Sequence, residues 1–230
     1  RATIECMDFV GFASGEDKKA IFSAAELGLV KTADALALVL RNFSDDLIDG
    51  LLGKPDPLRD FNDILTELVL SDLVTAETRL ERIEHYTARG ASTPEMEIER
   101  RALAKARDAL EKNQLISSLD FSPEEIRQLR GFQFLTGKPL MAVLNSGEEN
   151  FGGNTELLAV IREAVPVVEF AGRFEMELAG LSDADAAEFM ADMNIEASAR
   201  ERLTMLAYEV LGYITFFSVG QDEVRAWTVK

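Results

Sequence analysis

The chain has 230 residues, of which 47% are hydrophobic, and this is enough to bury one substantial core and a smaller module. Its 41 acidic and 24 basic residues give a formal net charge of −17, which excludes attraction of the whole surface to nucleic acid and leaves only local basic patches for that purpose. A single cysteine, Cys6, excludes an internal disulfide, and the single histidine, His85, excludes a histidine-based metal site. No apolar run approaches the roughly 20 residues of a membrane span.

The first predicted element is a strand over residues 4–11, which ends in the pattern Asp8-x-x-Gly11. In nucleotide hydrolases the Asp of such a pattern lies near the magnesium ion, and the Gly N–H faces the γ-phosphate. The spacing is also common in ordinary turns, so the pattern carries little weight alone. This strand would bury Cys6 as an inert core thiol. A helix over 17–31 and a strand over 34–40 are predicted next.

From residue 61 the apolar residues recur at intervals of three and four, the narrow seam of a coiled coil. A loop over 88–94 interrupts the pattern, and a second helix is predicted over 95–113. We therefore expect an antiparallel helical hairpin, inserted between two strands of the sheet. Its basic residues are the candidates for a local basic patch, although their alternation with Glu also fits a solvated helix face: Arg79, Arg82, Arg89, Arg100, Arg101, Lys105 and Arg107.

The α/β pattern resumes at Ser122, a good helix N-terminus. The predicted elements after it are a strand over 140–144, a helix over 154–164, a strand over 166–170, helices over 182–193 and 199–211, and a β-hairpin over 213–219 and 223–229. The fold class is therefore α/β, a mostly parallel sheet interrupted by the helical hairpin.

The apolar strand over 140–144 ends on Asn145, and Glu148 follows three residues later. Ligands of open α/β sheets bind at the carboxyl ends of such strands. An amide and a carboxylate at that place can hydrogen-bond the edges of a purine, and the equivalent pattern in GTPases is Asn-x-x-Asp. Here the acid is Glu, whose longer side chain is placed differently.

Several stretches resemble the YchF, or Obg-like ATPase, family, and they occur in order over essentially the whole chain. They are the run Arg41-Asn-Phe43-Ser-Asp45-Asp46, the helical segment 67–82, Phe-Glu-Met-Glu-Leu at 174–178, the segment 207–217 and the closing Glu-Val-Arg-Ala-Trp-Thr-Val at 223–229. The resemblance implies a P-loop-NTPase-type G domain in two parts, 1–60 and 122–211, with an inserted coiled-coil hairpin over 61–121. Residues 212–230 would begin a β-grasp TGS module.

The family resemblance also implies a cytoplasmic protein that binds and hydrolyses ATP or GTP with Mg²⁺ and associates with ribosomes. It implies no membrane and no sequence-specific DNA as a partner. Asn145 would contact the N7 side of the purine, Glu148 and the loop at Gly172 the base, Gly11 the γ-phosphate, and Asp8 the magnesium ion through water. No residue is assigned as catalytic.

Two departures from the family leave an alternative open. The glycine-rich switch is largely lost over 12–19, and Ala171-Gly172-Arg173 stands where the family has Ser-Ala-Lys. The Gly-Lys pairs at 53–54 and 137–138 precede Pro, so neither is a phosphate-binding loop, which the family would place before Arg1. Without that loop, residues 1–230 are expected to show no hydrolysis. The alternative is a catalytically degenerate member that acts as an interaction scaffold through its helical hairpin.

Overall fold

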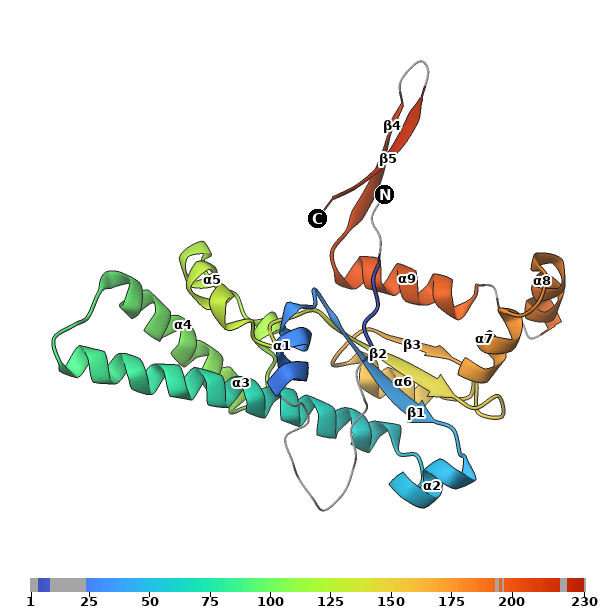
Figure 1. Ribbon diagram of the computed structural model, residues 1–230, viewed down its shortest axis with the longest axis horizontal. Coiled ribbons are helices and arrows are strands. Elements are labelled where there is room, and N and C mark those ends of the chain that lie inside the picture. Colours follow the sequence, from blue (N-terminus) through green and yellow to red (C-terminus); the bar gives the residue numbers. More distant parts are fainter. Residues whose placement is uncertain (1–3, 9–23, 193–194, 196, 220–222, 230) are drawn as a thin grey trace. The chain divides into compact units, whose positions relative to one another are not determined.

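The computed structural model describes residues 4–8, 24–192, 195, 197–219 and 223–229 (Figure 1). The helices are α1 (Ala24–Thr32), α2 (Asp46–Leu52), α3 (Pro57–Ala88), α4 (Pro94–Leu110), α5 (Pro123–Leu129), α6 (Thr155–Arg162), α7 (Gly172–Leu178), α8 (Asp183–Asp192) and α9 (Ala199–Val210), with short 3-10 turns η1 (Ile116–Ser118) and η2 (Arg130–Phe132). The strands are β1 (Leu36–Asn42), β2 (Leu140–Ser146), β3 (Val167–Phe170), β4 (Ile214–Val219) and β5 (Val224–Val229).

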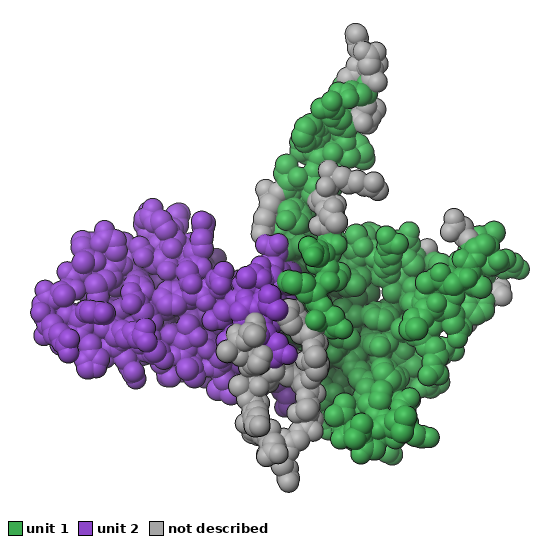
Figure 2. Space-filling view, in the orientation of Figure 1, with its two compact units in different colours: residues 1–19, 37–61, 140–230 green, residues 20–36, 62–139 purple. Residues whose placement is uncertain are grey.

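The chain forms two compact units, coloured separately in Figure 2. Unit 1 comprises residues 1–19, 37–61 and 140–230, and unit 2 comprises residues 20–36 and 62–139. Unit 1 therefore contains most of the sheet, whereas unit 2 contains most of the two long helices.

The sheet of unit 1 has the strand order β1-β2-β3, with β2 in the centre. β2 and β3 are parallel, with Ala142 opposite Val167 and Asn145 opposite Phe170. β1 runs in the same direction as β2, because hydrogen bonds of 3.0 Å join Leu36 N–H to the carbonyl of Pro139 and Gly147 N–H to the carbonyl of Asn42. Helices α6 and α9 contact the strands. The predicted α/β fold with a parallel sheet is confirmed, and all three carboxyl strand ends lie at one edge.

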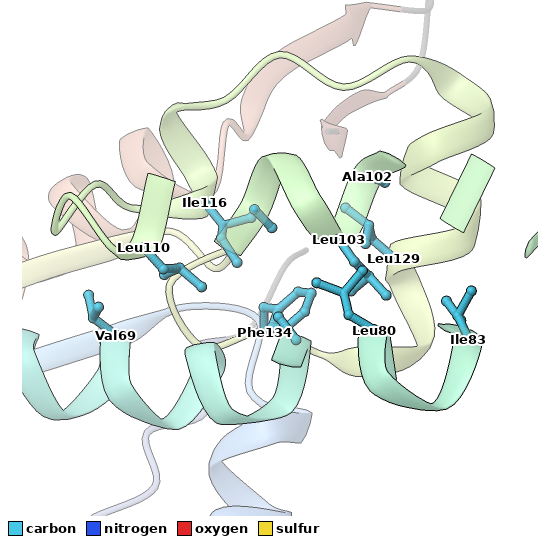
Figure 3. Close-up of a cluster of buried hydrophobic side chains, with 11 residues drawn as sticks. Val69, Leu80, Ile83, Ala102, Leu103, Leu110, Ile116, Leu129 and Phe134 are labelled. Carbon is cyan, nitrogen blue, oxygen red and sulfur yellow. The ribbon is translucent and has the colours of Figure 1, made fainter. Parts of the chain in front are cut away.

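Unit 2 is organised by a hydrophobic core between α3, α4 and α5 (Figure 3). Val69 of α3 lies next to Leu110 of α4, and Leu80 lies next to Leu103, so the two helices run antiparallel. Arg79 of α3 and Glu99 of α4 join them through two hydrogen bonds of 2.7 and 2.8 Å. The helices predicted from the apolar periodicity are therefore present, and α3 begins at Pro57, earlier than expected.

A buried carboxylate ties the middle of α3 to the segment that leads into β2. Asp72 is 1% exposed, and its oxygens accept hydrogen bonds from the N–H of Leu135 (2.9 Å), the N–H of Thr136 (2.7 Å) and the hydroxyl of Thr136 (2.7 Å). Two residues later, the ammonium of Lys138 donates to the carbonyls of Lys31 and Ala33, just after and within the last turn of α1. The start of β2 is thereby held by polar contacts as well as by apolar packing.

The amino-terminal prediction was wrong. Residues 4–8 are exposed and form no strand, and Cys6 is exposed rather than buried. An apolar run becomes a strand only where a neighbouring strand accepts its N–H and C=O groups, and no strand of the described chain pairs with this segment. Residues 9–23, including Gly11 and most of the expected helix 17–31, lie outside the described residues.

Two short helices were not predicted from the sequence, namely α2 and α7. Asp45 caps α2, because its side chain accepts hydrogen bonds of 3.1 Å from the N–H groups of Leu47 and Ile48. The predicted β-hairpin is present as β4 and β5, which are antiparallel. No helix in the described ranges is long and apolar enough to cross a membrane.

Replacing Asp72 by Asn should destabilise the chain by about 1–3 kcal/mol at pH 7. The amide offers one acceptor oxygen and one donor group, so at least one buried N–H or hydroxyl of Leu135 and Thr136 loses its acceptor. The exposed Asp63 of the same helix is the matched control, and Asp63→Asn should change the free energy of unfolding by less than about 0.5 kcal/mol. Equal stability of the two variants in urea denaturation would contradict the role of Asp72.

The same pair of proteins yields a pH dependence. Burial raises the pKa of Asp72, against the lowering effect of the hydrogen bonds from Thr136 and Leu135. In the folded chain this carboxyl therefore takes up its proton at a higher pH than in the unfolded chain, so its contribution to stability is lost as the pH rises. The stability of the wild type relative to Asp72→Asn should increase when urea denaturation is repeated at pH 4.5 instead of 7.

Candidate nucleotide-binding site

A cluster of hydrogen-bonded polar side chains lies at the carboxyl edge of the sheet, and we call it the Ser146 cluster: Asn42, Ser146, Asn154 and Glu169. The Ser146 hydroxyl donates to the carboxylate of Glu169 (2.6 Å) and accepts from the amide of Asn42 (2.9 Å). The amide of Asn154 donates to the same Glu169 oxygen (2.6 Å). These contacts join the ends of β1 and β2 to β3 and to the start of α6, so the edge is fixed by side chains as well as by the strand ladder.

Asn145 leaves the cluster and turns to the start of α7. Its Oδ1 accepts a hydrogen bond of 3.0 Å from the backbone N–H of Gly172. Because an N–H can only donate, this bond requires the oxygen on that side and leaves the Nδ2 amide as the group available to a ligand. Gly172 is needed for the approach, since a Cβ there would lie 2.9 Å from Oδ1 and 3.2 Å from Nδ2. The structure therefore brings together two of the predicted base-contacting residues.

The other predicted site residues are placed differently. Glu148 lies in the turn after β2, is exposed, and makes no hydrogen bond or ion pair within the described part of the chain. Asp8 belongs to the exposed segment 4–8, which forms no strand. Gly11 lies outside the described residues. No group of three acidic, histidine or cysteine side chains suitable for a metal ion occurs among the residues that the structure describes.

An arginine supports this edge from behind, and the sequence did not indicate it. Arg202 of α9 donates from Nη1 to the backbone carbonyl of Glu169 (2.6 Å), and its guanidinium lies 5.9 Å from the ring centre of Phe151. Its Nη2 is 3.9 Å from a carboxylate oxygen of Glu175, which itself accepts the N–H of Ala199 at the start of α9 (2.6 Å). The available signal was Glu169, a charged residue within a predicted buried strand.

The candidate basic patch is partly neutralised. Arg79 pairs with Glu99, Arg100 with Glu97 at 3.1 Å, and Arg107 with Asp108 at 2.7 Å. Arg82 and Arg89 are exposed. This pairing fits the solvated helix face for those three arginines.

Comparison with known proteins gives a consistent relationship. The chain is 34% identical to the ribosome-binding ATPase YchF of Haemophilus influenzae over 232 residues, which cover 99% of this chain and 63% of the relative. It is 31% identical to the Bacillus subtilis ribosome-binding ATPase YchF over 233 residues (98% and 63%), and 29% identical to the Obg-like ATPase 1 of Schizosaccharomyces pombe over 241 residues (100% and 61%). No family model matches the chain.

The solved structure of the Schizosaccharomyces pombe YchF GTPase superposes with a TM-score of 0.75 at 28% identity, over 94% of this chain and 60% of that one. The chain belongs to the YchF/Obg-like ATPase family. It spans about three-fifths of the length of these relatives. The Asn145–Gly172 contact is thus a feature of a chain whose sequence relationship to YchF proteins covers almost all of its residues.

Replacing Gly172 by Ala should lower the free energy of unfolding by about 1 kcal/mol, because the added Cβ displaces the Asn145 amide and breaks its hydrogen bond. Gly50, inside α2 with nothing within 4 Å of an added Cβ, is the control. Gly50→Ala should leave stability unchanged or raise it by up to about 1 kcal/mol. Urea denaturation measures both variants, and an Ala at 172 that stabilises as much as one at 50 would show that the close approach is not required.

Proposed function

We propose that this chain contains the purine-reading part of an Obg-like nucleotide hydrolase, with the base bound at the carboxyl end of β2. The observation that carries the proposal is the orientation of Asn145, whose oxygen is used by Gly172 and whose Nδ2 donor faces no partner in the described chain. The N7 atom of a purine is a hydrogen-bond acceptor, so this donor suits it. The position at the carboxyl edge of a parallel sheet supports the same conclusion.

The remaining site residues take roles around that contact. Glu148 would accept N–H groups of the base, and the backbone at Gly172 would border it. Asp8 would serve the magnesium ion of ATP or GTP, which commonly takes one or two carboxylates together with nucleotide phosphates and water, and an exposed carboxylate meets that requirement. Gly11 would face the γ-phosphate. Hydrolysis belongs to the whole protein, since residues 1–230 contain no phosphate-binding loop motif.

The relatives that are named ribosome-binding ATPases support a ribosome-linked, cytoplasmic role for this chain. In the domain arrangement that we propose, 1–60 and 122–211 form the nucleotide-binding domain, 61–121 the inserted hairpin and 212–230 the start of a TGS module. The apolar residues of β4 support the last assignment, because a lone two-stranded hairpin is at best marginally stable: Phe217 is 67% exposed and Val219 is 77% exposed.

A second function, an interaction scaffold without catalysis, is favoured by one observation. Residues 4–8 lie outside the sheet, so Asp8 is not held at a strand end as the phosphate-side residues of such sites usually are. The purine-reading edge and the helical hairpin could then serve binding alone. Turnover by the whole protein separates the two functions.

The test of base recognition compares ATP with 7-deaza-ATP, which lacks the N7 acceptor. The wild type should bind ATP about 3–10-fold more tightly, the equivalent of one hydrogen bond, and Asn145→Ala should bind the two alike. Asn150→Ala, an exposed amide in the following turn, should retain the preference. Dissociation constants come from NMR titration with magnesium, which also measures millimolar binding. A wild type that binds neither compound, or both equally, would overturn the proposal.

Replacing Glu148 by Asp should shift preference from ATP toward GTP by about 1–3 kcal/mol, because the shorter carboxylate can accept the paired N–H groups of guanine. The neighbouring exposed Glu149 is the control, and Glu149→Asp should leave the ratio of the two dissociation constants unchanged. Calorimetric titration with each nucleotide supplies the ratio. If both substitutions leave it unchanged, Glu148 does not read the base.

A further inference from the structure

A shallow groove of about 480 Å³ runs along α4, on the side turned away from the core of unit 2, and it is lined mostly by basic side chains. Ala104 and Ala109 form its apolar floor, and Gln114 and Leu119 of the segment after α4 form its other wall. The charged residues of its lining are Arg100, Arg101, Lys105, Asp108 and Lys112. Four positive charges stand against one negative charge in a chain whose net charge is −17.

Three of these cations keep their charge free of a carboxylate. Within the described part of the chain, no carboxylate oxygen lies within 4.0 Å of Arg101, Lys105 or Lys112. By contrast, Arg100 pairs with Glu97, and Asp108 pairs with Arg107, which does not line the groove. The only acid of the lining is therefore already neutralised by an arginine outside it.

The ammonium of Lys105 is held in place by neutral groups. It donates to the backbone carbonyl of Asp120 and lies 4.8 Å from the ring centre of Phe121. Neither contact offsets its charge as a carboxylate would. Lys105 lies four residues after Arg101, which places the two about 6 Å apart along the helix axis, and Lys112 lies about two turns further. The three charges thus form a row along an apolar floor.

We propose that this α4 groove binds the phosphate backbone of RNA, and that it is the surface through which the chain contacts ribosomal RNA. A row of exposed cations along a narrow groove matches a chain of phosphates and carries no base-edge readout, so recognition here is independent of sequence. The high negative charge elsewhere confines any RNA to this face. The partner named here rests on the proposed ribosome-linked function, whereas the binding chemistry rests on the groove itself.

The first experiment measures binding of a fluorescent 20-nucleotide RNA hairpin by anisotropy over a range of salt concentrations. Three phosphate contacts should give a slope of log K against log salt of about −2 to −3. Lys112→Ala should weaken binding of every hairpin sequence alike and reduce the slope by about one. An affinity that depends on hairpin sequence but not on salt would overturn the proposal.

The second arm uses charge reversal with a matched control. The groove variant Arg101→Glu/Lys105→Glu/Lys112→Glu should lose at least about tenfold in RNA affinity. The control variant reverses three exposed arginines outside the groove, Arg127, Arg162 and Arg200, and so changes the net charge equally. It should stay within about threefold of the wild type. Equal loss in both variants would mean that only net charge matters, which would overturn the groove as a site.

Co-sedimentation of the 230-residue chain with bacterial ribosomes separates this inference from the proposed function. The wild type and the control variant should sediment with ribosomes, and the groove variant should not, while its titration with ATP stays unchanged. If the groove variant sediments normally, the inference is wrong and the ribosome link stands. If the wild type itself does not sediment, the ribosome link fails. Sedimentation of the wild type together with no binding of naked RNA would assign the groove to an acidic protein and overturn the RNA assignment.

Discussion

Burial of β2 between two parallel neighbours is the constraint from which the candidate site follows. Leu140 to Leu144 are all buried, and so is Ser146. A hydroxyl at such a place must have partners, because an unsatisfied buried polar group costs about 1–3 kcal/mol. Asn42 and Glu169, at the ends of the adjacent strands, supply them. The Ser146 cluster is thus the consequence of ending a buried strand with a polar residue.

Strand alternation then accounts for the direction of Asn145. Successive side chains of a strand point to opposite faces, so Asn145 cannot join the cluster that Ser146 enters. It is only half-buried and meets the first residue of α7 instead. The hydrogen bond from Gly172 fixes the amide without using its donors. One strand end therefore holds a structural hydroxyl on one side and a ligand-facing amide on the other.

Local patterns predicted most of the elements in this chain. The capping boxes of Ser122 with Glu125 and of Ser198 with Glu201 formed as their spacing indicates, and the apolar runs of the three parallel strands were found. Residues 4–8 had the composition of a strand, but a strand also needs a neighbour, which composition does not report. Helix α2 was missed because its cap, Asp45, precedes only seven residues, too few for a periodic signal.

The site could be predicted at Asn145 because a polar residue directly after an apolar strand is visible in the sequence. The contacts that support it were not visible, since they join residues far apart: Asn42 with Ser146, Glu169 with Arg202, and Asp72 with Thr136. Each of these polar residues has an ordinary solvated interpretation when it is considered alone. Only the fold brings their partners within hydrogen-bonding distance.

Two kinds of group would read the base in the proposed site, and they differ in how strongly they can discriminate. The Asn145 amide is oriented by a backbone N–H before any ligand arrives, so little ordering cost is added on binding. Glu148 is exposed in a turn and must both lose water and become ordered to accept N–H groups. N7 is present in adenine and guanine alike, so the oriented contact selects purines, whereas the choice between them falls to the exposed carboxylate. Weak discrimination between ATP and GTP follows from this division, and covering Glu148 from solvent would sharpen it.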